Sequence, residues 1–238
     1  MSHPTTVESQ TSCEFCKSHH RSLFKSLDQA DVDRVDANRT CTKYKKGQVL
    51  FHEGTRPMGV FCVNAGRIKV FRIGLDGKEQ IIKVSGGGDL LGYKSLISDQ
   101  LYGLTAEAID DCILCFIPKE DFLSLLRPGS NFYMDLLQAV CRETGALSSK
   151  MTEMAQRSVR QRLALALLML KDTYGLEQEE SGEIEINLTR EDLANLIGTA
   201  TESLIRLLND FKKEGLIETT GRKIRVLNSE KLLQVSIR

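Results

Sequence analysis

The chain has 238 residues, of which 41% are hydrophobic and 27% charged, and its 32 basic residues are balanced by 32 acidic ones. This composition is typical of a soluble globular protein with one or two domains, and no segment reaches the ~18–20 consecutive apolar residues of a membrane span. Zero net charge excludes a general electrostatic attraction to nucleic acid, so a nucleic-acid function would require a local basic site.

Residues 1–40 are polar and contain the motif Cys13-x-x-Cys16, followed by His19 and His20. They lack the apolar stretch of a secretory signal, so we expect a cytoplasmic protein. The whole chain has seven cysteines, and an odd number without such a signal argues against a disulfide framework and favours free, mostly buried thiols. A short helix is expected at residues 28–37.

Short β-rich segments separated by Gly, Asp and Asn fill residues 41–126. Asp76-Gly77, between two such segments, suits a tight hairpin turn. Many short strands joined by glycine-containing turns are typical of a sandwich or barrel, and we expect a β jelly roll.

The periodicity changes to that of a long helix at residues 130–156. Apolar residues recur there at steps of three and four along one stripe: Tyr133, Leu136, Val140, Leu147, Met151 and Met154. Such a coiled-coil-like seam needs a partner, either the β domain of the same chain or a second copy of the helix. We expect the second copy, and hence a homodimer.

The C-terminal region begins with SVRQRLALALLMLKDTYG, a helix that is apolar over most of its circumference and should lie in a small core. An acidic loop and a short strand, IEINL, follow it. Thr189 can cap a helix REDLANLI, which Gly198 ends. Thr199 can cap the next helix, which Gly215 stops, and two short strands then flank a turn at Gly221.

Two short helices joined by a Gly turn and followed by a hairpin predict a winged helix-turn-helix, whose second helix fits the major groove of DNA. Glu202 can accept from a cytosine amino group and Arg206 can donate to guanine, and the two share one helix face. The candidate DNA contacts are Thr199, Thr201, Glu202, Ser203, Arg206 and, for phosphate, Lys212, Lys213, Arg222 and Lys223. A solvated Glu202–Arg206 pair, or a capping box completed by Glu202, is the alternative interpretation.

Nearly the whole chain resembles the CRP/FNR superfamily of bacterial transcription regulators. The resemblance is strongest in KKGQVLFHEG, GRIKVFRIGLDGKEQIIKVSGGGDLLGY and LTREDLANLIGTATESLIRLLNDFKKEGLI. It implies an α+β fold with a β jelly-roll sensor domain, a long dimerisation helix and a C-terminal winged helix-turn-helix. We assign a cysteine-containing segment to residues 1–40, a cyclic-nucleotide-binding-like jelly roll to 41–128, the dimerisation helix to 129–156 and the DNA-binding domain to 157–238.

In this family a recognition-helix Glu and the Arg four residues later read the DNA core, and Glu202 and Arg206 occupy these positions. The FNR branch usually has Ser directly before that Arg, where this chain has Ile205, so its preferred DNA site is expected to differ. The resemblance also implies RNA polymerase as a partner.

Family members that bind cAMP hold its cyclic phosphate with an Arg-Ser or Arg-Thr that follows a Gly-Glu turn. No Arg lies between Gly88 and Ala108 in this chain, and Tyr102 aligns near the Arg position. A buried phosphate without a cationic partner is costly, so we expect that the sensor domain does not bind cAMP.

FNR-type oxygen sensors hold an iron–sulfur cluster with N-terminal cysteines and one jelly-roll cysteine before an Ile-Pro. Cys13, Cys16 and Cys115 match that pattern, while the third N-terminal cysteine falls at Ser22. A fourth ligand could come from His19, His20, Cys41 or Cys112. Three alternatives therefore remain for the cysteines: a 4Fe–4S cluster, zinc or a thiol switch on Cys13-x-x-Cys16, or no metal.

The sequence thus predicts a DNA-binding transcription regulator, a homodimer specific for a pseudo-palindromic site and controlled by oxygen or redox state if a cluster binds. The alternative is a ligand-binding regulatory protein whose helix-turn-helix contacts protein. We do not expect an enzyme, because the four histidines lie in no nucleophilic or acid–base arrangement.

Overall fold

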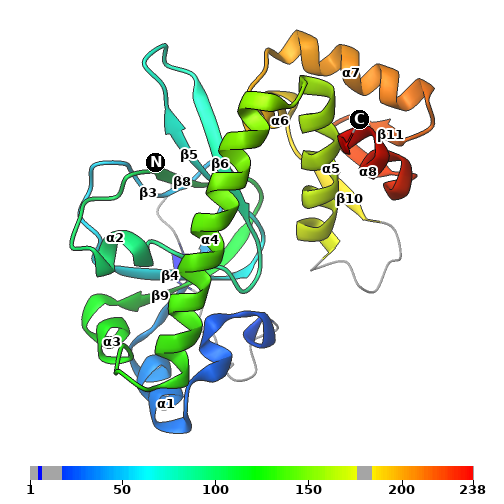
Figure 1. Ribbon diagram of the computed structural model, residues 1–238. Helices are drawn as coiled ribbons and strands as arrows, with labels where there is room; N and C mark the ends of the chain where they lie inside the picture. Colours follow the sequence, from blue (N-terminus) through cyan, green and yellow to red (C-terminus); the bar gives the residue numbers. More distant parts are fainter. Residues whose placement is uncertain (1–4, 7–17, 176–183, 238) are drawn as a thin grey trace. The chain divides into compact units, whose positions relative to one another are not determined.

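The computed structural model describes residues 5–6, 18–175 and 184–237 (Figure 1). Within these residues the chain forms two compact units. The N-terminal unit takes in residues up to 72 and 85–144, and the C-terminal unit takes in 73–84 and the residues from 145 onward. No helix in the described ranges is both long and apolar enough to cross a membrane.

The first part of the chain consists mainly of short strands. In order, its elements are β1 (Thr5–Thr6), η2 (His19–Arg21), η3 (Leu23–Ser26), α1 (Gln29–Asn38), β2 (Thr40–Tyr44), β3 (Val49–Phe51), β4 (Gly59–Ala65), β5 (Ile68–Ile73), β6 (Glu79–Ser85), β7 (Leu90–Leu91), α2 (Tyr93–Ile97), β8 (Thr105–Ala108), β9 (Cys112–Pro118) and α3 (Lys119–Ser124). The helix predicted at residues 28–37 is α1, whose N-cap Asp28 accepts a hydrogen bond from the Asp31 amide.

The strands form two antiparallel sheets, ordered β1-β2-β9-β4-β7 and β3-β8-β5-β6. Apolar side chains from both sheets meet in one buried cluster: Val63, Ile68, Val70, Leu91, Ala106, Ala108, Cys112 and Leu114. Alternate residues of each strand point to the same side, so each sheet has one apolar face. Burial of these two apolar faces against each other holds the sheets together. The predicted α+β fold with a β jelly roll is confirmed.

A second cluster lies on the helical side of the first sheet and holds the start of the long helix α4 (Asn131–Gln156). The ring of Phe132, which is 1% exposed, stacks on Phe24 at 5.7 Å and meets Phe122 edge-on at 6.1 Å. Leu136 is buried in the same cluster. Full burial of one such side chain contributes roughly 1.5–3 kcal/mol, so this cluster anchors α4 to the N-terminal unit.

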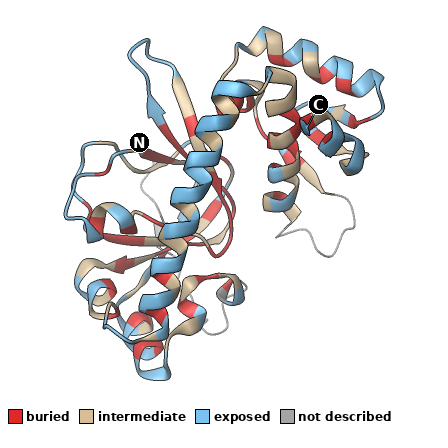
Figure 2. Ribbon diagram, in the orientation of Figure 1, coloured by how far each residue is buried: buried red, intermediate tan, exposed pale blue. Residues whose placement is uncertain are grey.

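The other side of α4 is exposed for much of its length (Figure 2). The predicted apolar stripe therefore divides into two parts. Leu136 and Val140 pack on the chain's own core, whereas Tyr133, Leu147 and Met151 are 37%, 44% and 74% exposed. Met134 and Leu137, which the predicted stripe does not contain, are each 47% exposed.

Cys41 and Cys115 form a disulfide, which corrects the expectation that no disulfide would form, whereas Cys62, Cys112 and Cys141 are free thiols, as expected for most of the cysteines. The two residues are 74 apart in sequence, but the antiparallel register of β2 and β9 sets them directly opposite each other. Register depends on the whole sheet, so a count of cysteines could not reveal the pair.

The C-terminal part contains α5 (Val159–Gly175), β10 (Glu185–Asn187), α6 (Arg190–Ile197), α7 (Thr201–Lys213), β11 (Ile217–Thr220), β12 (Lys223–Val226) and α8 (Ser229–Ile237). The strands form an antiparallel sheet in the order β10-β12-β11. As predicted, α5 is central, and its Leu163, Leu167 and Leu170 are fully buried. Sequence reasoning missed α8, although Asn228 signals its start by accepting from the Lys231 amide at 2.9 Å.

Polar side chains attach residues of the β5–β6 hairpin to helices of this unit. The Lys150 ammonium of α4 donates to the backbone oxygens of Ile81 and Ile82 at 3.2 and 2.9 Å. Gln80 donates to the Asn195 carbonyl of α6 at 2.6 Å. One end of the hairpin strand β6 is thus hydrogen-bonded to the first helix of the helix-turn-helix.

Candidate nucleic-acid interface

The first helix of the helix-turn-helix, α6, has the boundaries that its sequence predicts. The Thr189 hydroxyl accepts from the Asp192 amide at 3.0 Å and donates to the Asp192 carboxylate at 2.5 Å. Gly198 ends the helix with φ +65°, a left-handed conformation that costs other residues energy. The local sequence therefore determines where α6 starts and stops.

Arg162 of α5 fixes the turn between the two helices, and sequence reasoning missed it. Its guanidinium donates to the carbonyls of Ile197 and Gly198 at 2.9 and 3.2 Å. The same group donates to the carbonyls of Met154 and Arg157 at 3.3 and 2.9 Å. Arg162 thus satisfies orphan carbonyls at the end of α6 and ties the turn to the end of α4. A charged residue inside the apolar pattern of α5 was the available signal.

The second helix of the helix-turn-helix, α7, has one buried and one exposed face. Leu204, Leu208 and Phe211 are at most 4% exposed, and Ile205 on the other face is 43% exposed. The predicted cap at Thr199 is wrong, because the N-cap is Ala200 and makes no side-chain cap bond. Thr199 instead lies in the turn, where its amide bonds to the Ala194 carbonyl.

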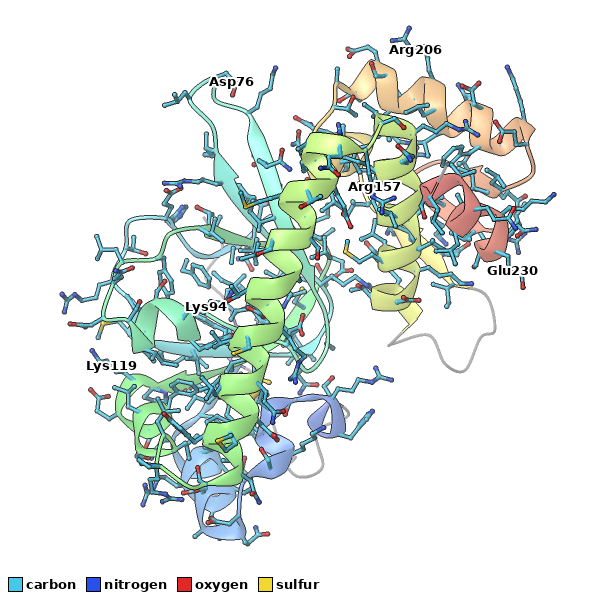
Figure 3. All side chains as sticks on the ribbon, in the orientation of Figure 1. Asp76, Lys94, Lys119, Arg157, Arg206 and Glu230 are labelled. Atoms are coloured by element: carbon cyan, nitrogen blue, oxygen red, sulfur yellow. A yellow bond between two sulfur atoms is a disulfide. The ribbon has the colours of Figure 1, made fainter. Side chains whose placement is uncertain are left out.

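Glu202 and Arg206 both lie exposed on α7, one turn apart. Figure 3 shows Arg206 projecting outward from the helix. Its guanidinium donates to the Ser203 hydroxyl at 3.3 Å, and no ion pair joins it to Glu202 in the part of the chain that the structure describes. The simple i,i+4 ion pair considered as an alternative is therefore not formed. Thr201 and Ser203 flank this surface and are half-buried.

The predicted phosphate contacts fall into two groups. Lys212 and Lys213 are exposed in the last turn of α7, where they also complement the helix dipole. Lys223 on β12 is already in an ion pair with Glu185, at 2.5 Å. Arg222 is exposed at the tip of the hairpin.

The hairpin β11–β12 is attached to the helix-turn-helix by Arg190, the first residue of α6. Its guanidinium donates to the carbonyls of Gly221 and Arg222 at 3.0 and 3.2 Å. This contact holds the wing tip beside the start of α6.

Tyr102, which the family resemblance aligns near the Arg of cAMP-binding members, is a buried aromatic residue. Tyr102 is 5% exposed, and its ring stacks on Phe51 at 3.9 Å. Burial raises the pKa of Tyr102 to about 12, so the phenol is neutral at ordinary pH. A neutral ring cannot compensate a phosphate charge, which supports the expectation that cAMP does not bind.

The described residues do not assemble an iron–sulfur site. Cys13 and Cys16 lie outside them, and Cys115 is bonded to Cys41. Burial raises the pKa of Cys112 to about 12, which keeps it a protonated thiol. Ser22 caps η3 by accepting from the Phe24 amide, and no group of three potential metal ligands occurs in the described ranges. The donor set in this state does not fit a cluster.

Two segments of the chain match known protein families. Residues 41–128 match the family described as Cyclic nucleotide-binding domain, and residues 161–235 match the Crp-like helix-turn-helix domain. Transcriptional activator protein FnrA of Stutzerimonas stutzeri is 27% identical over 226 residues, covering 94% of this chain and 91% of that protein. The fumarate and nitrate reduction regulatory protein of Escherichia coli is 25% identical over 225 residues, with 94% and 90% covered.

Solved structures share the fold. FixK2 from Bradyrhizobium japonicum superposes with a TM-score of 0.73 at 21% identity, over 83% of this chain and 96% of that one. A CRP/FNR-family transcriptional regulator from Thermus thermophilus superposes with a TM-score of 0.68 at 22% identity, over 83% and 98%.

Proposed function

The chain belongs to the CRP/FNR family of DNA-binding transcription regulators, and from this premise we propose that it acts as a homodimer specific for a pseudo-palindromic DNA site. In the division of roles that we propose, residues 41–128 sense a signal, 129–156 form the dimer and 157–238 bind DNA. Two recognition helices related by a twofold axis would lie about one DNA turn apart, roughly 34 Å.

The observation that carries the proposal is the exposed polar face of α7. Its apolar face is buried, while Arg162 and Arg190 hold the turn and the wing in place. On that surface Glu202 can accept from cytosine and Arg206 can donate two bonds to guanine. Thr199, Thr201 and Ser203 lie beside them, and the basic residues Lys212, Lys213, Arg222 and Lys223 would position the backbone.

DNA binding is tested by a gel shift with genomic fragments followed by selection of bound sequences. We expect a twofold-symmetric site whose halves are one helical turn apart. A protein that retards no fragment while it captures a protein partner through residues 188–227 would favour the alternative, a helix-turn-helix that contacts protein.

The dimer is supported by the exposed side of α4. Met134, Leu137, Cys141 and Met151 are exposed there at spacings that fit one coiled-coil seam. In a symmetric seam the two copies of Cys141 would lie close together. Mild oxidation should then give a covalent dimer that the variant Cys141→Ser does not form, and sedimentation should show dimers of both proteins under reducing conditions.

RNA polymerase is the proposed partner at the promoter, in keeping with the relative named as a transcriptional activator. Transcription in vitro with purified polymerase and a promoter that carries the selected site tests this. Any change in transcript yield that depends on the site supports the proposal, and its sign distinguishes activation from repression.

Control by oxygen through a 4Fe–4S cluster on Cys13, Cys16 and Cys115 remains a hypothesis suggested by the relatives named for fumarate and nitrate reduction. It requires Cys115 to be reduced. Anaerobic purification with iron, sulfide and zinc analysis distinguishes a cluster, zinc on the Cys13-x-x-Cys16 pair and no metal.

A further inference from the structure

Three buried cysteines lie in a row across three adjacent strands of the N-terminal unit. Cys41 on β2 is directly opposite Cys115 on β9, and Cys115 is directly opposite Cys62 on β4. All three belong to the same buried cluster and are 4%, 5% and 9% exposed. Residues directly opposite each other point to the same face of a sheet, so Cys115 has a cysteine neighbour on either side.

The register explains why Cys41 and not Cys62 is the disulfide partner. Cys41 and Cys115 have Cα atoms 4.1 Å apart, the spacing of a non-hydrogen-bonded pair. In an antiparallel sheet the N–H and C=O of one residue point toward the same neighbouring strand. Those of Cys115 therefore point away from β2 and toward β4, so Cys115 forms the wider, hydrogen-bonded type of pair with Cys62. In such a pair the Cα atoms are about 5.5 Å apart. Cys62 carries a thiol.

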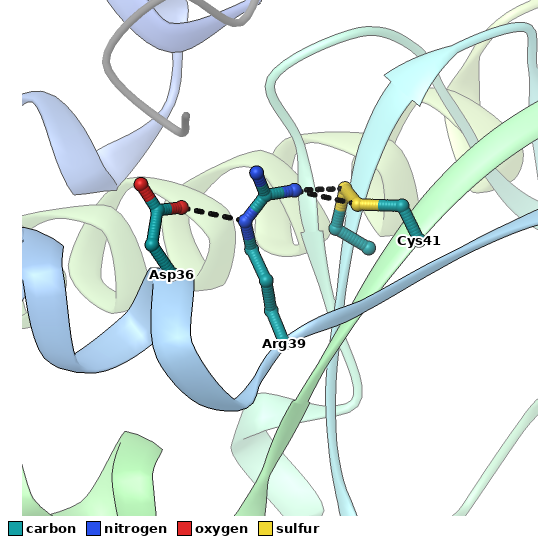
Figure 4. The surroundings of a disulfide bond; sticks show 4 residues. Asp36, Arg39 and Cys41 are labelled. Atoms are coloured by element: carbon teal, nitrogen blue, oxygen red, sulfur yellow. Dashed lines mark hydrogen bonds and ion pairs between the residues drawn. A yellow bond between two sulfur atoms is a disulfide. The ribbon is translucent and has the colours of Figure 1, made fainter. Parts of the chain in front are cut away.

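A cation lies against both bonded sulfur atoms (Figure 4). The Arg39 guanidinium is 2.6 Å from the Cys41 sulfur and 3.4 Å from that of Cys115, and its Nε donates to the Asp36 carboxylate at 2.6 Å. Arg39 directly follows α1, and its side chain is only 8% exposed. The sulfur atom that leaves in a thiol–disulfide exchange carries negative charge, and the guanidinium is placed to stabilise it.

We propose that Cys41 and Cys115 are a dithiol–disulfide pair that changes DNA binding when a peroxide oxidises it, and that a small dithiol reverses the change by thiol–disulfide exchange, becoming a disulfide itself. The effect on DNA rests on the proposed function, whereas the chemistry does not. A sulfur of the pair attacks the peroxide O–O bond and becomes a sulfenic acid, releasing hydroxide, which takes up the proton of that thiol. The second thiol displaces water and the S–S bond forms. In sum, two thiols and one hydrogen peroxide give one disulfide and two waters.

A peroxide suits this site because it is small, whereas a bulky disulfide oxidant cannot reach side chains that are about one-twentieth exposed. The change reaches α4 through packing. Reduction replaces a covalent bond with two sulfur atoms that must move to non-bonded separation, and their cluster contains Phe132 and Leu136 of α4. A close-packed cluster transmits that expansion to the helix.

The experiment uses the full-length chain, reduced with dithiothreitol without oxygen, desalted and exposed to hydrogen peroxide. Alkylation and peptide mapping should show a Cys41–Cys115 cross-link that dithiothreitol removes from the native protein. The variant Cys41→Ser should not form this cross-link. The control variant Cys112→Ser, which changes another cysteine of strand β9, should still form it. Absence of the cross-link in folded wild-type protein, or its persistence under native dithiothreitol, overturns the proposal.

DNA affinity is measured on both redox forms in a Cys13→Ser/Cys16→Ser background, which removes the N-terminal pair. We expect the two forms to differ at least about fivefold, the lower end of typical coupling, and Cys41→Ser to abolish the difference. Equal affinities with the cross-link present overturn the switch. Loss of DNA binding in both forms would be a failure of the proposed function instead, and the peptide map still decides the redox chemistry.

Discussion

Arg206 and Glu202 are the residues on which base recognition by α7 would depend. Both side chains are exposed, and Arg206 donates to the Ser203 hydroxyl of its own helix, a partner that a base can replace. Arg162 has the opposite character, because its guanidinium bonds to four carbonyls and is part of the scaffold. We therefore expect substitution of Arg206 to affect DNA binding and substitution of Arg162 to affect the stability of the domain.

Replacing Arg206 by Ala should weaken binding to the cognate site by about 1–3 kcal/mol and relax the base preference at one position in each half-site. Fluorescence anisotropy with the cognate duplex and with single-base variants measures both effects. An equal loss on random DNA would contradict a role in base recognition and indicate a phosphate contact.

Replacing Arg162 by Gln should destabilise the C-terminal unit by roughly 1–3 kcal/mol, because carbonyls of the turn lose their donors. Amide hydrogen exchange should become faster at Gly198 and Thr199, and the conservative variant Arg162→Lys should recover part of the protection. Unchanged exchange in the glutamine variant would show that water replaces the guanidinium without loss.

At the level of elements, the turn between α6 and α7 depends on one backbone conformation. Gly198 has φ +65°, and a Cβ atom there would lie 2.4 Å from the Met154 Cε, the end of a flexible side chain. Gly145 offers a matched comparison, since it lies inside α4 and a Cβ atom there meets nothing within 4 Å.

Gly198→Ala should therefore destabilise the unit by roughly 1–2 kcal/mol through the left-handed conformation. Gly145→Ala should have the opposite sign and stabilise α4 by about 0.5–1 kcal/mol. Urea unfolding followed by circular dichroism compares the two variants. Equal shifts of the same sign would refute the assignment of strain to the turn.

For the whole molecule, the proposed dimer would make each phosphate contact twice, once from each subunit. Because the net charge is zero, we expect the salt dependence of DNA binding to arise from local groups such as Lys212 and Lys213 and not from the overall field. Lys223 forms an ion pair with Glu185, so we expect its charge to contribute less to phosphate binding.

Lys212→Ala should lower the slope of log K against log salt by about 2 if two subunits bind, and by about 1 if one does. Lys223→Ala should lower the slope less, since Glu185 already offsets its charge. Titrations at several salt concentrations give both slopes. An unchanged slope for Lys212→Ala would place that residue away from the phosphates.

Sequence alone determined the features that depend on neighbouring residues. The cap at Thr189, the stops at Gly198 and Gly215 and the wing turn at Gly221 follow from side chains a few positions apart, and the structure has each of them. The resemblance to CRP/FNR regulators rested on the same local patterns, and the comparisons bear it out.

Tertiary structure alone decided what depends on distant residues meeting. Sheet register placed Cys41 against Cys115, and the packing of α4 on Phe24 and Phe122 decided which of its apolar residues are buried. Arg162 acquired its role because α5 passes beside the helix-turn-helix turn. The physical reason is the same throughout: a periodic pattern shows which residues share a face, and only the packed chain shows what that face meets.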